Sequence, residues 1–219
     1  MTWVLLIIFA FFAGSVPFGL LIARAKGIDI RAHGSGNIGA TNVGRVLGRR
    51  WGFLCFALDA AKGAAPVLIA GWVQSLLGVP IVAIPEPDLW CWLATGVAAL
   101  LGHVYSPWIR FKGGKGVATG FGAFLAMWTP LTTATGVALL VWFVLLKLTK
   151  MMSLASIIAA ISIPATIMIH CSLLAKPAQA FRAATPTLIV SGAMALLIIF
   201  KHRANIGRIL SGQELKVKA

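Results

Sequence analysis

Long apolar stretches separated by short polar segments dominate this sequence, and they predict helices that cross a membrane. Residues 2–23 form a run of 22 residues without a charged side chain, which is long enough to cross about 30 Å of hydrocarbon as a helix. The run lacks the basic start of a secretory signal, so we expect it to remain as the first helix. Further spans are expected at about residues 51–74, 89–108 and 153–173, with a last span at 186–200.

The apolar stretch 117–146 is 30 residues long, which is too long for one comfortable crossing and short for two. The distribution of positive charge decides between these alternatives, because Lys and Arg are enriched in cytoplasmic loops. A single crossing would put 11 Lys and Arg residues inside and seven outside, whereas two helices separated at Thr129-Pro130 put 16 inside and two outside. We therefore predict seven transmembrane helices, two of them short, with the N-terminus outside and the C-terminus in the cytoplasm.

The composition supports an all-α polytopic membrane protein. The chain is 59% hydrophobic and only 11% charged, with a mean hydropathy of +0.93, which lies outside the range of soluble globular domains. Without an internal repeat or a separate soluble region, residues 1–219 are expected to form one integral-membrane domain. The net charge of +14 would suggest nucleic acid in a soluble protein. Here the basic residues lie in short loops, so membrane topology and anionic ligands explain them and no nucleic-acid partner is expected.

Glycine, small polar residues and positive charge concentrate between Arg31 and Arg45. Glycine allows close approach of the backbone to a ligand, and backbone N–H groups, hydroxyls and a guanidinium can together hold a phosphate. Gly/Ser/Asn-rich segments are also typical of plain loops, so a loop and an anion site are the two alternatives for this stretch. The polar side chains that it offers are Ser35, Asn37, Thr41 and Asn42.

A second glycine-rich stretch, Phe-Lys-Gly-Gly-Lys-Gly-Val-Ala-Thr, occupies residues 111–119. It differs from a nucleotide-binding P-loop because glycine, and not Ser or Thr, follows its second lysine, so an ATPase is not expected. A simpler anion site would use glycine N–H groups, the lysine ammonium and the N-terminus of a helix that begins near Val117. A basic loop that holds lipid headgroups is the alternative. The candidate residues are Gly113, Gly114, Lys115 and Gly116.

The third polar stretch, residues 201–214, places His202 three residues before Asn205, so both share a face if the last helix continues. A histidine just beyond a membrane helix is commonly interfacial, but the neighbouring amide, arginine and carboxylate favour a catalytic or substrate-positioning role. His33 and His103 are weaker candidates.

The few acidic residues narrow the possible chemistry. Asp59 and Lys62 are three residues apart inside a predicted span, where an ion pair is the default and support for the neighbouring site is the alternative. The sequence offers no pair of carboxylates for a metal or for acid/base work, and the three cysteines are far apart, so neither a metal nor a cofactor is expected. A reaction with an already activated substrate would need only binding, orientation and anion stabilisation.

Taken together, the stretches 33–45, 102–119 and 201–214 resemble the bacterial membrane acyl-phosphate:glycerol-3-phosphate acyltransferases, the PlsY family. Their order and spacing cover nearly the whole chain. The resemblance implies transfer of a fatty acyl group from acyl phosphate to the 1-hydroxyl of sn-glycerol 3-phosphate, giving lysophosphatidic acid and phosphate in phospholipid synthesis. It also implies a multi-pass protein of the bacterial inner membrane, in contact with membrane lipid, whose active site faces the cytoplasm.

The resemblance extends to single positions. The catalytic residues that it implies are Ser35, Arg45, Lys115, His202 and Asn205. With the polar residues of the first stretch added, the candidate substrate-binding residues are Asn37, Thr41, Asn42, Gly113, Gly114, Gly116 and Ser153. Relatives tend to have two adjacent serines where this chain has Met152-Ser153, so only one serine is carried over. Glu214 matches a glutamate that looks structural in the family, and His202 either accepts the hydroxyl proton or orients glycerol phosphate.

Other functions were weighed against this resemblance. A transporter of a phosphorylated metabolite would place its polar breaks near the middle of the membrane in paired halves, whereas here they gather on one predicted face without a repeat. A lipid-binding scaffold would show no turnover. Acyltransferases that use coenzyme A thioesters have a different sequence motif, in which Asp follows five residues after His. None of the four histidines is followed in this way, since Ile38, Trp108, Ala175 and Gly207 occupy those positions. We therefore expect acyl phosphate to be the donor.

Overall fold

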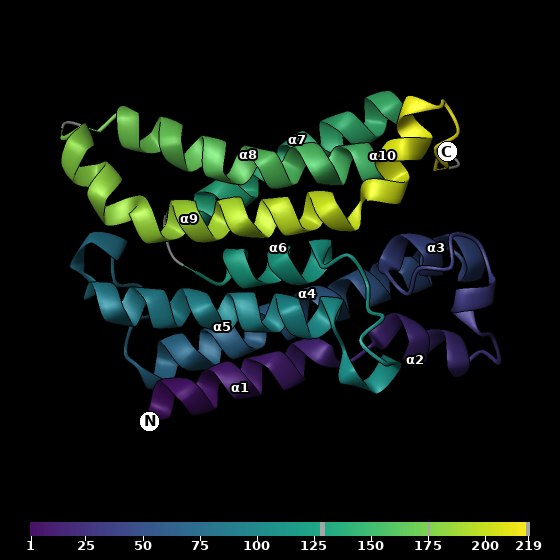
Figure 1. The fold of residues 1–219 in the computed structure, drawn as a ribbon, viewed down its shortest axis with the longest axis horizontal. Helices are drawn as coiled ribbons and strands as arrows, with labels where there is room; N and C mark the ends of the chain where they lie inside the picture. Colours follow the sequence, from purple (N-terminus) through teal and green to yellow (C-terminus); the bar gives the residue numbers. More distant parts are fainter. Residues whose placement is uncertain (128–129, 175, 218–219) are drawn as a thin grey trace. The chain divides into compact units, whose positions relative to one another are not determined.

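The computed structural model describes residues 1–127, 130–174 and 176–217, and over these residues it is helical and contains no strand. The chain groups into two compact units, one formed by residues 1–70 and 94–123 and the other by residues 71–93 and 124–219. We call them the first unit and the second unit. The single domain expected from the sequence remains a prediction. Figure 1 labels the helices.

The first unit contains the N-terminal helices and most of the polar stretches. Its elements are α1 (Thr2–Ser15), α2 (Phe18–Arg24), η1 (Ile30–Ala32), α3 (Ala40–Leu47), most of α4 (Arg49–Val73), the C-terminal half of α5 (Glu86–Val104), η3 (Pro107–Ile109) and most of α6 (Val117–Leu125). The second unit contains η2 (Ile81–Ala83), α7 (Leu131–Thr149), α8 (Met152–Ser172), α9 (Pro177–Lys201) and α10 (Arg203–Leu210). A loop or an anion site was expected for the first polar stretch, so the helix α3 is an addition to that expectation.

Six helical segments of the described chain are long and apolar enough to cross a membrane. They are Thr2–Arg24, Arg49–Val73, Glu86–Ile109, Leu131–Thr149, Met152–Ser172 and Pro177–Lys201. The seventh expected helix corresponds to α6, which has nine residues and at 1.5 Å per residue is too short to cross about 30 Å alone. The expectation of two short helices is wrong for α7, which has 19 residues. Thr129 of the expected break lies outside the described residues.

Prolines explain two further differences from the expected helices. The first span is not one helix, because α1 ends before Pro17 and α2 begins after it; proline lacks an N–H donor and disrupts the preceding turn. The last span begins at Pro177 and not at Pro186, which lies buried inside α9. Proline is well suited to the first helical position, and the alanines that follow Pro177 favour a helix.

Glycines bring the helices of the first unit into close contact. A Cβ atom on Gly14 of α1 would collide with the backbone of Ala99 in α5, and one on Gly102 of α5 would collide with the backbone of α1. Gly63 of α4 meets α6 at Thr119 in the same way. Without side chains between them, helix backbones can approach closely, as membrane helices commonly do. In the second unit, α8 packs against both α7 and α9, and α10 packs against the ends of α8 and α9.

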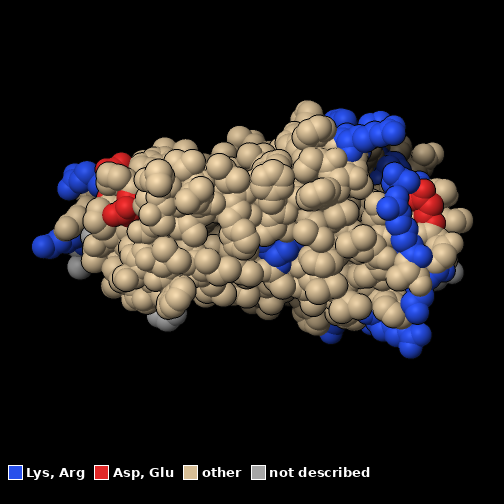
Figure 2. Space-filling model, turned by 90° about the horizontal axis from the view of Figure 1, so that it is seen from below, with Lys and Arg blue, Asp and Glu red and all other residues tan. Residues whose placement is uncertain are grey.

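The outer faces of the long helices are apolar. Large exposed side chains include Phe12 in α1, Phe53 and Trp72 in α4, Leu140 in α7 and Leu196 in α9. On the face drawn in Figure 2, most of the surface is uncharged, and the blue Lys and Arg side chains gather mainly toward its ends. Exposed apolar surface of this extent is typical of helices surrounded by lipid.

Candidate functional site

The first polar stretch is held in shape by the side chain of Asn42, which lies in α3 and is only 1% exposed. Its Oδ1 accepts a hydrogen bond from the backbone N–H of Ser35 at 2.8 Å. Its Nδ2 donates to the carbonyl oxygens of His33 at 3.0 Å and of Ile30 at 3.3 Å. Because both ends of the amide bind the loop, Asn42 fixes the shape of this stretch.

Apolar side chains anchor the same stretch to the core of the first unit. Ile30, Ile38 and Val43 are buried there together with residues of α2 and α4. Between Ile30 and Ile38 the Ser35 side chain is exposed. The side chain of Arg45, in the last turn of α3, is exposed as well. Asn37 accepts a hydrogen bond from the N–H of Gly39 at 2.8 Å, which shapes the turn before α3. The anchoring thus leaves a hydroxyl and a guanidinium at the surface.

An exposed ion pair precedes this loop. Arg31 donates to Asp29 from Nε at 2.9 Å and from Nη2 at 2.8 Å. These hydrogen bonds, with one from the Arg31 backbone N–H, lower the pKa of the Asp29 carboxyl to about 2. Asp29 therefore stays ionised over the physiological range and reduces the positive charge that Arg31 could offer to a ligand.

The second stretch folds back onto the last turn of α5. The N–H of Gly113 donates to the carbonyl oxygen of Val104 at 3.1 Å, and that of Gly114 donates to the carbonyl oxygen of His103 at 3.3 Å. These two N–H groups are therefore bound within the protein, which differs from the anion cradle expected from the sequence. Glycine is required for another reason: a Cβ atom on Gly113 would collide with the backbone at His103 and Val104, and one on Gly114 with the His103 ring.

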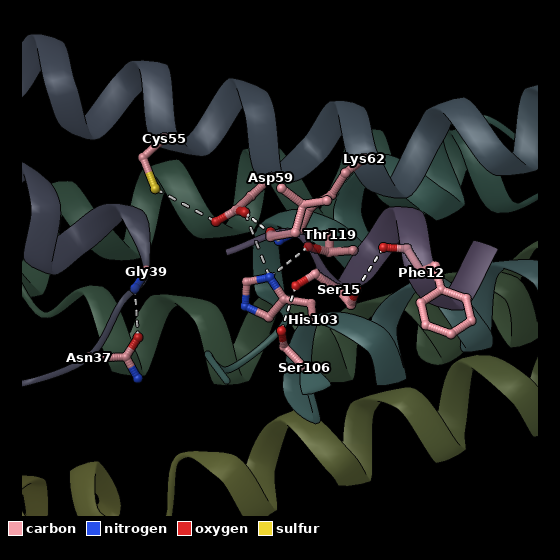
Figure 3. Close-up of polar contacts among 11 residues, drawn as sticks. Phe12, Ser15, Asn37, Gly39, Cys55, Asp59, Lys62, His103, Ser106 and Thr119 are labelled. Atoms are coloured by element: carbon pink, nitrogen blue, oxygen red, sulfur yellow. Dashed lines mark hydrogen bonds and ion pairs between the residues drawn. The ribbon is translucent and has the colours of Figure 1, made fainter. Parts of the chain in front are cut away.

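A buried polar cluster surrounds the side chain of His103, as Figure 3 shows. The predicted ion pair is confirmed, with Lys62 Nζ 2.7 Å from Asp59 Oδ1 and both side chains almost fully buried. His103 Nδ1 is 3.7 Å from the same carboxylate oxygen and 3.1 Å from the Thr119 hydroxyl. Helices α4, α5 and α6 thus each contribute a polar side chain to one cluster.

The same cluster and its neighbours supply hydrogen-bond donors to the backbone at the break between α1 and α2. Pro17 cannot donate a hydrogen bond, and carbonyl groups next to such a break need other partners. Lys62 Nζ donates to the carbonyl oxygen of Val16 at 2.6 Å, and the Ser106 hydroxyl donates to that of Ser15 at 2.6 Å. Trp108 Nε1 donates to the Ser15 hydroxyl at 2.7 Å. The break is therefore tied both to α4 and to the segment after α5.

The third stretch belongs to the second unit, and the last helix does not continue through it: α9 ends at Lys201 and α10 begins at Arg203. His202 lies between them, is 3% exposed, and has Nδ1 2.7 Å from the carbonyl oxygen of Ile198. A carbonyl oxygen only accepts, so Nδ1 carries the proton. In a neutral imidazole, Nε2 is then the nitrogen with the lone pair.

Glu214 binds three other polar side chains of the second unit. Its Oε1 accepts from the Ser153 hydroxyl at 2.7 Å and from Asn205 Nδ2 at 2.6 Å, and its Oε2 accepts from Arg208 Nε at 2.8 Å. Burial by itself would raise the pKa of Glu214, but the three hydrogen bonds outweigh it and lower that pKa below its usual value. The C-terminal segment is also bound by the Val217 N–H, which donates to the Lys150 carbonyl oxygen.

The predicted site residues therefore fall into two groups. The first unit carries Ser35, Asn37, Thr41, Asn42, Arg45 and the glycine-rich loop with Lys115, and the second carries Ser153, His202 and Asn205. His103 was a weaker candidate in the sequence, whereas in the structure it contacts the loop through its carbonyl and its ring. Its position ten residues before Gly113, at the end of a predicted span, was the available signal. Among the described residues, no group of three or more His, Cys, Asp or Glu side chains is placed to hold a metal ion.

Comparison with known proteins identifies the family of this chain. The family model for glycerol-3-phosphate acyltransferase matches residues 4–212. A glycerol-3-phosphate acyltransferase of Geotalea daltonii is 46% identical over 211 residues, which is 96% of this chain and 95% of the relative. That of Desulforudis audaxviator is 45% identical over 212 residues, with 96% and 93% covered.

Solved structures give the same result. The glycerol 3-phosphate form of PlsY (YgiH), an integral membrane glycerol 3-phosphate acyltransferase, is 38% identical and aligns with a TM-score of 0.83 over all of this chain and 96% of that chain. Its lysophosphatidic acid form is 37% identical, with a TM-score of 0.80 and the same coverage. These matches do not favour the transporter alternative. The chain therefore belongs to the family of integral membrane glycerol-3-phosphate acyltransferases.

Proposed function

We propose that this protein transfers a fatty acyl group from acyl phosphate to the 1-hydroxyl of sn-glycerol 3-phosphate, forming lysophosphatidic acid and phosphate. The observation that carries the proposal is the similarity of the whole chain to two forms of PlsY, one named for glycerol 3-phosphate and one for lysophosphatidic acid. The sequence stretches that resemble this family also supply the side chains that the reaction needs.

Acyl phosphate suits a protein that offers binding and orientation more than covalent catalysis. It is a mixed anhydride, so the glycerol hydroxyl oxygen can attack the acyl carbon directly and phosphate leaves when the acyl carbon–oxygen bond breaks. The hydroxyl proton passes either to His202 or to the departing phosphate. Nε2 of a neutral His202 is suited to accept it, since Nδ1 already donates to the Ile198 carbonyl.

Positive charge and fixed hydrogen-bond donors are the second requirement, because both substrates carry phosphate. We propose that Ser35, Arg45 and Lys115 bind and polarise the phosphate groups, and that Asn205 orients glycerol phosphate beside His202. Asn37, Thr41, Asn42, Gly113, Gly114, Gly116 and Ser153 complete the proposed substrate-binding set. The contacts support shaping roles for Asn42, Gly113, Gly114 and Ser153, since each is bound to another part of the chain.

The identity of the acyl donor can be tested directly. The purified protein, reconstituted in lipid, is incubated with glycerol 3-phosphate and either acyl phosphate or a purified acyl-CoA or acyl carrier protein free of any enzyme that converts it to acyl phosphate. We expect stoichiometric lysophosphatidic acid and phosphate with acyl phosphate and essentially no product with the thioesters. Comparable rates with acyl-CoA would refute the donor while leaving the acyltransferase family unchanged.

A further inference from the structure

We infer that His103 is a positioning residue, which holds the glycine-rich loop, residues 113–116, in the shape needed to bind the phosphate of glycerol 3-phosphate. The inference rests on the proposed function, because it assigns the loop to that substrate. It adds a residue outside the loop whose role is to set the loop's geometry.

Backbone and side chain of His103 both contact the loop. Its carbonyl oxygen accepts the N–H of Gly114 at 3.3 Å, and the carbonyl oxygen of the next residue, Val104, accepts the N–H of Gly113 at 3.1 Å. Nε2 and the two neighbouring ring carbons are the atoms that a Cβ on Gly114 would meet first. The imidazole therefore forms the surface against which Gly114 packs, and no larger residue fits there without displacing the ring or the loop.

The ring is fixed on its other side. Nδ1 lies 3.1 Å from the hydroxyl of Thr119 and 3.7 Å from Asp59 Oδ1, and the His103 side chain is only 4% exposed. Figure 3 shows that this nitrogen faces Asp59 and Thr119. Asp59 is itself held by Lys62 at 2.7 Å, so the imidazole contacts a carboxylate that has little freedom to move.

This arrangement links the two ends of the loop. His103 lies in the last turn of α5, before the loop, whereas Thr119 lies in the first turn of α6, after it. The imidazole between them ties the two turns together through Gly114 and the Thr119 hydroxyl. Because a displacement of about 1 Å in a positioning element is enough to weaken catalysis strongly, loss of this link is expected to affect phosphate binding without removing a group that touches substrate.

Thr119 provides the mildest test. Thr119→Val removes the hydroxyl at nearly constant volume, and Thr119→Ser retains it as a matched control. We expect Thr119→Val to raise the KM for glycerol 3-phosphate about tenfold while the KM for acyl phosphate changes less than about twofold. Thr119→Ser should be close to the wild-type protein. Thermal unfolding of each variant in detergent shows whether the protein is folded.

A double-mutant cycle tests the ring directly. In Gly114→Ala the new methyl group meets side-chain atoms of His103, whereas in Gly113→Ala it meets the backbone at residues 103 and 104. His103→Ala should therefore relieve part of the Gly114→Ala defect, with a coupling of at least about threefold in the KM for glycerol 3-phosphate. It should relieve nothing of the Gly113→Ala defect, because the colliding carbonyl oxygens remain.

Opposite outcomes overturn the inference. A normal KM for glycerol 3-phosphate in Thr119→Val and His103→Ala, or equal losses in all kinetic constants with a lower unfolding temperature, would show that His103 has only a structural role. If the wild-type protein forms no product from acyl phosphate, the proposed donor fails separately. The same variants are then compared by equilibrium binding of radiolabelled glycerol 3-phosphate, where unchanged affinity would overturn the inference.

Discussion

At the scale of single residues, buried polar side chains in this protein bind other parts of the chain. The amide of Asn42 forms hydrogen bonds with the loop before α3, and the carboxylate of Glu214 accepts hydrogen bonds from three donors. Each buried donor and acceptor has a strong requirement for a partner. Asn42 therefore shapes the loop that carries the exposed Ser35, and Glu214 fixes Ser153 and Asn205.

Glu214 gives a prediction at this scale. Glu214→Gln keeps the size of the side chain but removes the charged acceptor shared by Ser153, Asn205 and Arg208, and should lower the free energy of unfolding by about 1–3 kcal/mol at neutral pH. The folded-state pKa of Glu214 is lowered. Its stabilising effect is therefore complete above the ordinary carboxyl pKa and is lost as the pH falls through the lowered folded-state pKa.

The measurement compares the unfolding of both proteins in detergent from about pH 7 down to about pH 3. The difference between them should shrink toward zero at the acidic end, because the wild-type carboxyl becomes protonated. Glu86→Gln is the control: Glu86 is exposed and accepts one hydrogen bond, from Trp90, so less than about 0.5 kcal/mol is expected. A difference that does not depend on pH would contradict the role given to the Glu214 charge.

At the scale of helices, the ion pair of α4 supplies a hydrogen bond that the break between α1 and α2 leaves unmade. Lys62 binds both Asp59 and the carbonyl oxygen of Val16, so it pairs with a buried carboxylate and also provides a donor for a carbonyl group at the end of α1. Removing one partner of a buried ion pair leaves the other charge without compensation, whereas removing both costs less.

This asymmetry predicts a non-additive mutant cycle. Lys62→Met alone should lower the stability by about 3–5 kcal/mol, and adding Asp59→Asn should restore part of that loss. The unfolding of the single and double variants in detergent measures the coupling. Lys112→Met, at an exposed position, should change little. If Lys62→Met is as stable as the wild-type protein, the pair does not hold the break.

At the scale of the whole molecule, the orientation in the membrane follows from charge. With the short α6 counted as a crossing, 16 Lys and Arg residues lie on one side, in the segments 24–50 and 110–115, at Lys147 and Lys150, and after residue 200, against Lys176 and Arg182 on the other. Positive charge is retained in the cytoplasm, so we infer an outside N-terminus and an active site that faces the cytoplasm.

Cysteine labelling tests this orientation. The three native cysteines, all free thiols, are first replaced, and single cysteines are then introduced at Asp88, Lys150 and Lys176. An impermeant thiol reagent added to intact cells should label Asp88→Cys and Lys176→Cys, whereas Lys150→Cys should react only after the membrane is opened. External labelling of Lys150→Cys would show that α6 and α7 do not reverse the chain as inferred.

Much of the fold could be predicted from local properties. Helix-length apolar runs identify membrane helices, and the runs at 51–74, 89–108 and 153–173 correspond to α4, α5 and α8. The ion pair between Asp59 and Lys62 was also predictable, since its partners are three residues apart on one helix. The break at Pro17 was missed because a hydropathy pattern does not register a proline inside an apolar segment. The start of α9 at Pro177 was missed because its first turns include Gln179 and Arg182 and are not apolar.

By itself the sequence determined the membrane class, most helices and the three polar stretches, because hydropathy and composition act over a few turns of chain. Only the tertiary structure decided the partners of the site residues. Ser153 and Glu214 are 61 residues apart, and His103 meets Thr119 across the loop. Such contacts depend on how helices pack, and on glycines that admit a neighbouring backbone, which no local pattern of side chains specifies.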